Sequence, residues 1–501
     1  MKAKNFLIST SAKWFDIFFV VIFNIISVPI ILSKWSIQTY AAWILLQGII
    51  GYVNIFCNGM VDYIYSKNLQ LGNKKKKEIS KNITSSLPFT ILIISTVILL
   101  LIIEFNYQFI TNSLNISQSM KREWSMALLL YGFYSLFTYT VSPFYTKALH
   151  VFGYLPLFLW QSCLRSFMGN LLLVIAIYFY NASLVIAFSV YMISGIILHL
   201  IESVIIYKIL KKEKITFEPI DLRKGFNNFV KSTWISFSYI MDSIGTNGLR
   251  IIISFLANPA SLVIFTTIRT ITNMIMHGMG TIRDSFLIEV MSHISKNDTK
   301  KMNISFEFYY IFIAIIVFPF LIILQFFVED IYNIWTLGNI QFHFKTYTIL
   351  IIAVLISCIG LPFRLIVTGN NLIKTKFLTS LIKNSFLILF IIIFYKEIKI
   401  LSFSIGLLLS ELIELIINYF IVNNFFKKIK FSYNKKVVIN MLINLSICCV
   451  IFITSSFYNI SVSDYNLLVV YCVILYLLNT LLIFKRISFN TIKSVKKMLN
   501  K

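Results

Sequence analysis

Charged residues are scarce in this chain, and acidic residues are the scarcest of all. Only 13% of the 501 residues are charged, whereas 58% are apolar. A soluble protein of this length could not hide so much apolar surface. Each membrane-spanning helix needs about 20 apolar residues, so the chain has room for about fourteen. The apolar runs are continuous rather than alternating, which excludes a transmembrane barrel and predicts an all-α polytopic membrane protein.

Cysteine is also rare, and its placement excludes a metal centre or a disulfide framework. The 6 cysteines all lie within apolar runs, without the spacing of metal ligands. No nucleophile or phosphate-loop motif stands out either. We therefore expect no catalytic residue, no metal and no cofactor, and a transporter rather than an enzyme.

The apolar runs predict fourteen spans joined by short polar connections. Those spans cover residues 14–33, 39–63, 84–104, 125–146, 156–179, 183–207, 233–256, 260–287, 305–327, 346–368, 377–395, 400–422, 437–457 and 465–484. The connection 208–232 carries mixed charge and is read as a cytoplasmic linker between an N-terminal lobe (1–207, spans one to six) and a C-terminal lobe (233–424, spans seven to twelve). Residues 425–501 would hold spans thirteen and fourteen and a basic cytoplasmic tail.

The net charge of +25 sets the expected orientation. On a soluble protein it would suggest nucleic acid, but in a membrane protein it follows from the positive-inside rule. Most basic residues fall on one side if the chain begins in the cytoplasm, including the run from Lys74 to Lys77. This asymmetry predicts an even number of spans and cytoplasmic N- and C-termini, and it makes a nucleic-acid partner unnecessary.

The two lobes show weak internal similarity at corresponding places. Trp14 opens span one, as Trp234 opens span seven. Pro143-Phe144 ends span four, as Pro362-Phe363 ends span ten. Repeated halves with a central binding site are a common plan of membrane transporters, so this pattern favours a transporter.

Charges inside the predicted spans are the most informative residues. Each costs about 2.5–3.5 kcal/mol at a helix centre on insertion scales, so it should face a cavity or a partner. Polar stripes at helical spacing run along spans two, seven and eight and predict a water-filled cavity. Arginine favours an anionic substrate because guanidinium binds phosphate oxygens in pairs. The candidate substrate-binding residues are Arg269, Arg250, Arg165, Asn273, Arg364 and Lys383.

Acidic residues within the predicted spans could couple transport to an ion, and some of the embedded charges could instead be structural. Asp62 and Asp242 are candidates for coupling transport to an ion. Asp242 could instead pair with Arg250 and hold helices together. Lys383 could extend to the cytoplasmic interface. Glu411 and Glu414, and the pair His199 and Glu202, could each be structural.

The first two spans carry a family resemblance. The chain reads Val28-Pro29-Ile30-Ile31-Leu32-Ser33-Lys34-Trp35-Ser36, then Tyr40-Ala41-Ala42-Trp43, then Gly59 and Asp62. This resembles the polysaccharide transporters of the multidrug/oligosaccharidyl-lipid/polysaccharide (MOP) exporter superfamily and is most similar to O-antigen flippases. It departs twice from the family pattern, with Ala41 in place of a glycine and Cys57 where an aspartate is expected.

The resemblance implies a V-shaped pair of six-helix lobes with two peripheral C-terminal helices. It implies a bacterial inner-membrane flippase that moves an undecaprenyl-pyrophosphate-linked oligosaccharide to the external leaflet by alternating access. It also implies as partners the membrane lipids, a polysaccharide polymerase and a chain-length regulator. A multidrug or cation antiporter of the same superfamily is the main alternative. An O-antigen polymerase would need a large external loop, which the sequence lacks.

Overall fold

The structure is a computed structural model of the chain. It describes residues 3–71, 75–114, 116–295, 298–370, 372–428 and 435–457, with a few positions between 473 and 480. Every regular element in those ranges is a helix, and 10 helices there are long and apolar enough to cross a membrane. The prediction of an all-α polytopic membrane protein is confirmed.

The helices of the N-terminal part are α1 (Ala3–Lys34), α2 (Ile37–Leu71), α3 (Lys76–Tyr107), α4 (Phe109–Ser113), the 3₁₀ turn η1 (Gln118–Met120), α5 (Lys121–Tyr139), α6 (Val141–His150), α7 (Leu155–Tyr180), α8 (Leu184–Lys212), α9 (Leu222–Ser243), the π-helical turn η2 (Ile244–Gly248) and α10 (Leu249–Leu256). The remaining helices are α11 (Pro259–Ser295), α12 (Thr299–Phe312), the π-helical turn η3 (Ile313–Val317), α13 (Phe318–Trp335), α14 (Phe344–Gly369), α15 (Ile373–Ile398), α16 (Ile400–Lys428) and α17 (Lys435–Phe457).

Each predicted span up to 437–457 coincides with a helix or with consecutive helices. Span 125–146 is divided into α5 and α6, and spans 233–256 and 305–327 each contain a π-helical turn. Turns of this kind often mark functional or strained places within a helix. The predicted span 465–484 and the basic tail lie outside the described ranges.

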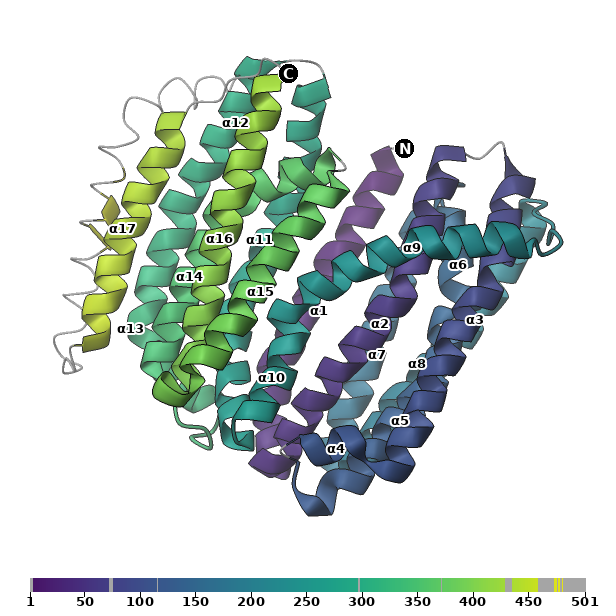
Figure 1. Cartoon of the computed structure of the whole chain (residues 1–501), viewed down its shortest axis with the longest axis horizontal. Helices are drawn as coiled ribbons and strands as arrows, with labels where there is room; N and C mark the ends of the chain where they lie inside the picture. The colour runs from purple at the N-terminus through teal and green to yellow at the C-terminus, as the bar shows by residue number, and fades with distance from the viewer. Residues whose placement is uncertain are drawn as a thin grey trace. The chain divides into compact units, whose positions relative to one another are not determined.

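The chain forms two compact units, residues 1–263 and 264–501. The predicted linker at 208–232 is not where they divide, because α9 and α10 belong to the first unit. There α9 packs along α2 and α3, and Figure 1 shows it crossing both helices.

Glycines on α2 allow that close packing. A Cβ atom on Gly51 would lie 2.2 Å from Nδ2 of Asn247, and one on Gly59 would lie 1.9 Å from Oγ of Ser236. Small residues that let two helices approach closely are a usual feature of helix contacts in membranes. Side chains on these glycines would push α9 and η2 away from α2.

Proline explains the break between α5 and α6. Pro143 has no N–H group, so it cannot donate to the carbonyl oxygen of Tyr139 four residues earlier. The helix ends at Tyr139, Thr140 has non-helical dihedral angles, and α6 starts at Val141. The new helix direction turns Ser142 and Lys147 toward the interior of the first unit.

The second unit is built around α14. Most of its side chains are buried, and it packs against α16 and α17, with α15 covering α16. The buried tyrosines of α12 anchor it, because the hydroxyl groups of Tyr309 and Tyr310 donate to the carbonyl oxygens of Cys358 and Ile359. A core helix held on several sides is a rigid support for the charges it carries.

Candidate functional site

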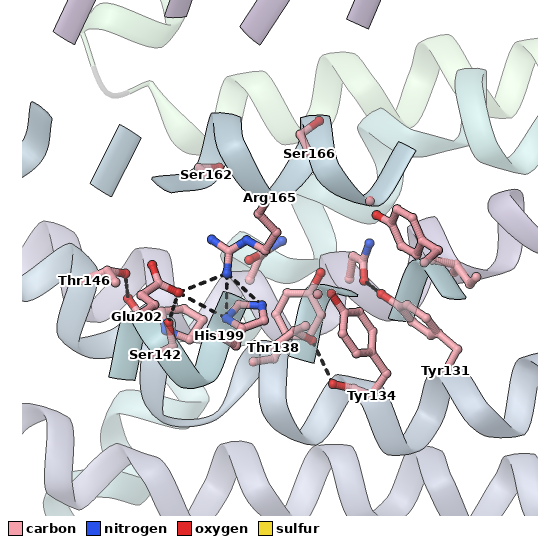
Figure 2. Close-up of a pocket in the computed structure, with 18 of the residues that line it drawn as sticks. Tyr131, Tyr134, Thr138, Ser142, Thr146, Ser162, Arg165, Ser166, His199 and Glu202 are labelled. Atoms are coloured by element: carbon pink, nitrogen blue, oxygen red, sulfur yellow. Dashed lines mark hydrogen bonds and ion pairs between the residues drawn. The ribbon is translucent and has the colours of Figure 1, made fainter. Parts of the chain in front are cut away.

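A polar cavity lies in the first unit, lined by residues of α2, α5, α6, α7 and α8 (Figure 2). Its volume is about 460 Å³, within the range of roughly 300–1,000 Å³ that holds small ligands. Amide and hydroxyl groups dominate its wall, which includes Gln47, Asn54, Asn58, Thr138, Ser142, Thr146, Ser162 and Ser166. These groups can both donate and accept hydrogen bonds, so the cavity suits a strongly polar ligand.

Aromatic rings form one continuous side of the cavity. Tyr131 lies 5.9 Å from Tyr134 and 6.1 Å from Phe188, measured between ring centroids. Phe188 in turn stacks on Tyr191 at 6.2 Å with an interplanar angle of 11°. We call Tyr131, Tyr134, Phe188 and Tyr191 the aromatic wall. The hydroxyl group of Tyr131 donates to Oδ1 of Asn54, which ties this wall to α2.

Two glycines leave the space that the tyrosine rings of this wall occupy. A Cβ atom on Gly195 of α8 would lie 2.2 Å from Oη of Tyr134. A Cβ atom on Gly169 of α7 would lie 2.9 Å from Cε2 of Tyr191. Both glycines line the cavity themselves, so a larger residue at either place would push a tyrosine ring out of its position.

Arg165 is the central charge of the cavity, and Figure 2 shows its guanidinium group directed from α7 toward α8. Its Nη1 atom lies 3.0 Å from Oε2 of Glu202 and 2.7 Å from Nε2 of His199. The same carboxylate oxygen lies 3.1 Å from Nδ1 of His199 and accepts a hydrogen bond from Ser142 at 2.7 Å. A neutral His199 can donate from Nδ1 to Glu202 and accept from Arg165 at Nε2.

This network leaves two sets of atoms available to a ligand. Within the described part of the chain, Nε and Nη2 of Arg165 and Oε1 of Glu202 have no hydrogen-bond partner. The side chain of Arg165 is 23% exposed. A pair of donors and an acceptor thus lie side by side at the cavity wall.

A second ion pair lies at the α6 side of the same cavity. Lys147 lines the cavity and donates to Oδ1 of Asp62 on α2. The other oxygen of Asp62 accepts a hydrogen bond from Tyr239 of α9 at 3.0 Å. Asp62, a candidate for ion coupling, therefore joins three helices and compensates the charge of Lys147.

The second unit gathers its charges in a different way. Nζ of Lys383 on α15 lies 2.5 Å from carboxylate oxygens of both Glu411 and Glu414 on α16. Arg364 on α14 reaches the same two acids, at 3.2 Å and 2.9 Å. We call Arg364, Lys383, Glu411 and Glu414 the ionic quartet. Two positive and two negative groups, each at least two-thirds buried, compensate one another across three helices.

The remaining candidates lie on other helices. Arg250 of α10 is half-buried against Gly48 of α2, and it forms no ion pair with any residue that the structure describes. Asp242 lies on α9. Arg269 and Asn273 lie about one turn apart on α11, both half-buried, and the carbonyl oxygen of Arg269 accepts from Thr272.

Several residues of the cavity are missing from the sequence-based candidates. Lys147 lies beyond the predicted span 125–146, because the break before Pro143 could not be located from hydropathy. The rings of Tyr134 and Tyr191 look like ordinary apolar filling in a chain with 26 tyrosines. The only feature of the sequence that points to each tyrosine is a glycine on a neighbouring helix. Which glycine contacts which tyrosine becomes known only from the packing of the helices.

No protein family and no curated protein matches this sequence. Solved structures do match the fold. The lipid II flippase MurJ, in an inward closed conformation, is 17% identical, with a TM-score of 0.70 over 96% of this chain and 99% of that one. A MOP superfamily transporter from Pyrococcus furiosus with a binding pocket of reverse polarity is 12% identical, with a TM-score of 0.60 over 86% of this chain and 97% of that one.

A multidrug resistance transporter of the same superfamily (MATE family), in an outward-facing conformation, is also similar. It is 11% identical, with a TM-score of 0.59 over 86% of this chain and 97% of that one. At these identities the likeness concerns the fold alone. The chain is a multi-pass membrane protein with the fold of MOP superfamily transporters.

Proposed function

We propose that this protein is a flippase for a lipid-linked oligosaccharide in the bacterial inner membrane. Its cargo would be an undecaprenyl-pyrophosphate-linked repeat unit of O-antigen or a similar surface polysaccharide, moved from the cytoplasmic to the external leaflet. The observation that carries this proposal is the polar cavity of about 460 Å³ within a membrane-spanning unit. The sugars of such a lipid need a hydrated, hydrogen-bonding path, because polar groups without partners are costly in the bilayer.

The fold supports a mechanism of alternating access, in which the binding site opens to one side of the membrane at a time. Arginines on α10 and α11 offer cations to a cargo that carries pyrophosphate. A membrane potential that is negative inside would favour outward movement of this anion by about 2.3 kcal/mol per charge per 100 mV. The lipid tail would remain in the bilayer.

A multidrug or cation antiporter is the second candidate. It is favoured by Glu202, which lines the cavity, and by Asp62, which pairs with the cavity residue Lys147, since acids attract cationic drugs and can carry protons. Each of these acids already compensates a basic side chain, Arg165 or Lys147. An unbalanced acidic cavity would suit that function better, so the flippase is preferred.

Deletion of the gene tests the proposal. We expect surface polysaccharide to be lost and lipid-linked repeat units to accumulate on the inner leaflet of the cytoplasmic membrane. Accumulation on the outer leaflet would indicate a polymerase instead. Unchanged polysaccharide together with increased drug susceptibility would contradict the flippase and favour the antiporter.

A further inference from the structure

The charges around the cavity are balanced, although the chain as a whole carries +25. The basic residues of the wall are Arg165 and Lys147, and each forms an ion pair with an acid, Glu202 or Asp62. A pyrophosphate group carries at least two negative charges and would have to compete with these carboxylates. Bringing it into such a cavity without extra cations would cost the desolvation of those charges. The cavity therefore suits a ligand that is polar and uncharged.

We infer that the cavity of the first unit is a sugar subsite, in which Tyr134 and Tyr191 pack against a sugar ring while Arg165 and Glu202 bind its hydroxyl groups. This inference rests on the proposed function and assigns one part of the cargo to one place. It separates the oligosaccharide from the pyrophosphate, which this cavity does not bind.

The free atoms at the wall match the chemistry of a sugar. Neighbouring hydroxyl groups of a sugar ring can both accept and donate hydrogen bonds. Nε and Nη2 of Arg165 supply donors, and Oε1 of Glu202 supplies an acceptor beside them. Hydrogen bonds to charged groups are stronger than those between neutral groups, so this pair would fix the orientation of the ring.

The aromatic wall supplies the other half of the recognition. A sugar ring has apolar C–H faces as well as hydroxyl edges, and flat aromatic rings cover such faces well. Tyr134 and Tyr191 line the cavity, and Gly195 and Gly169 fix where their rings lie. The tyrosine hydroxyl groups add further hydrogen-bond partners. These glycines are thus specificity-determining positions, because they set the distance between the aromatic wall and the ligand.

The pyrophosphate should then bind to a basic side chain that has no acidic partner. Arg250 forms no ion pair within the described ranges, and it packs against Gly48, the neighbour of the cavity residue Gln47 on α2. An uncompensated guanidinium group is the stronger anion contact. The first unit therefore contains two polar sites of different charge, with Arg165 for sugar and Arg250 for phosphate.

Binding measured on the purified full-length protein separates the two sites. The probes are inorganic pyrophosphate and a panel of methyl glycosides of glucose, galactose, N-acetylglucosamine and N-acetylgalactosamine, followed by saturation-transfer nuclear magnetic resonance. We expect at least one glycoside to bind, and pyrophosphate not to displace it. Failure of every glycoside to bind, or displacement by pyrophosphate, would overturn the sugar subsite.

Amino-acid substitutions test which residues contribute to glycoside binding. Tyr134→Ala should weaken glycoside binding roughly threefold to tenfold, the value of one aromatic contact, and leave pyrophosphate binding unchanged. Tyr207→Ala, an exposed tyrosine on α8, is the matched control and should change neither. Gly195→Ala should weaken glycoside binding by displacing Tyr134. Gly278→Ala should not, because its Cβ atom would have no neighbour within 4 Å.

The two arginines give the decisive contrast. Arg165→Gln should lose glycoside binding and keep pyrophosphate binding, and Arg250→Gln should do the reverse. Loss of pyrophosphate binding in Arg165→Gln with intact glycoside binding would refute the assignment. If glycosides bind as expected but reconstituted protein never moves a lipid-linked oligosaccharide, the flippase proposal fails and the sugar subsite stands. If transport occurs and Arg165→Gln affects only pyrophosphate, the sugar subsite fails and the flippase stands.

Discussion

The two units of this protein hold buried charges in opposite ways. In the first unit, Arg165 meets one acid through a single nitrogen, Nη1, and the rest of its guanidinium group borders a cavity. In the second unit, Arg364 forms ion pairs with acids through both Nε and Nη2, and Lys383 forms ion pairs with both acids as well. Buried charges with free donors are suited to binding a ligand, and fully paired charges are suited to holding helices together.

The ionic quartet should give the largest effect on stability. Lys383→Met leaves Glu411 and Glu414 with one cation between them inside the membrane. We expect a loss of about 3–5 kcal/mol in the free energy of unfolding, as for other broken buried ion pairs. Thermal unfolding of the purified protein measures it.

A second change provides the control. Adding Glu411→Gln to Lys383→Met restores one cation and one acid, so most of the stability should return. If the Lys383→Met single variant unfolds at the temperature of the wild type, the quartet does not hold the helices together. The contrast between the units would then be wrong.

Arg165 should give the largest effect on transport. Arg165→Gln should reduce transport of the lipid-linked oligosaccharide by roughly 10- to 100-fold, because hydrogen bonds to a charged group are lost. Its thermal unfolding must be measured beside transport, because the buried Glu202 loses its cation and keeps only the hydrogen bonds from Ser142 and His199. The exposed Arg223→Gln is the matched control. Transport at the wild-type rate in Arg165→Gln would remove the cavity from the transport path.

Alanine variants of two glycines allow the helix packing of the two units to be compared. A Cβ atom on Gly225 of α9 would lie 2.0 Å from the carbonyl oxygen of Ser85, whereas one on Gly360 of α14 would lie 3.5 Å from Leu415. Gly225→Ala should therefore destabilise the protein by about 1–3 kcal/mol through overpacking. Gly360→Ala should be neutral or stabilise by up to about 1 kcal/mol. Equal melting temperatures of the two variants would contradict this difference.

The smallest effect concerns the start of α9. Asp221 accepts a hydrogen bond from the backbone N–H of Lys224 and lies 3.0 Å from Lys81. These two contacts, in that order, lower the pKa of Asp221. Its contribution is present above the ordinary carboxyl pKa of about 4 and is lost as the pH falls through the lowered value.

Amide hydrogen exchange at the first turn of α9 measures this loss between pH 6 and pH 3. Protection should decrease in the wild type as the pH falls. Asp221→Asn keeps a capping oxygen without a charge, so its protection should not depend on pH. The same acid-dependent loss in that variant would exclude Asp221 as its cause.

Much of the fold could be predicted from the sequence, because long apolar runs leave few alternatives in a bilayer. The helices of the described spans and the embedded Arg165, Arg364 and Lys383 were found this way. Their partners were not all assigned, since Lys383 and Glu411 are 28 residues apart and meet only after α15 and α16 pack. The sequence placed these cations and acids in the membrane, but the ionic quartet exists only in the tertiary structure.

The cavity itself was harder to predict. The sequence predicts a polar stripe on span two, and Asn54 and Asn58 of that span line the cavity. Lys147 was missed because the break at Thr140 redirects α6. Tyr134 was missed because its position depends on Gly195, a residue of another helix.

The most direct test of this account is a leaflet-translocation assay with the full-length protein in liposomes. A polyprenyl-pyrophosphate-linked disaccharide is placed in the inner leaflet, and its appearance outside is measured with an added glycosidase that cannot cross the membrane. We predict rapid exposure with the wild type and with the Lys383→Met/Glu411→Gln double variant, and little exposure with Arg165→Gln. Exposure with Arg165→Gln at the rate of the wild type, or none with the wild type itself, would contradict the account.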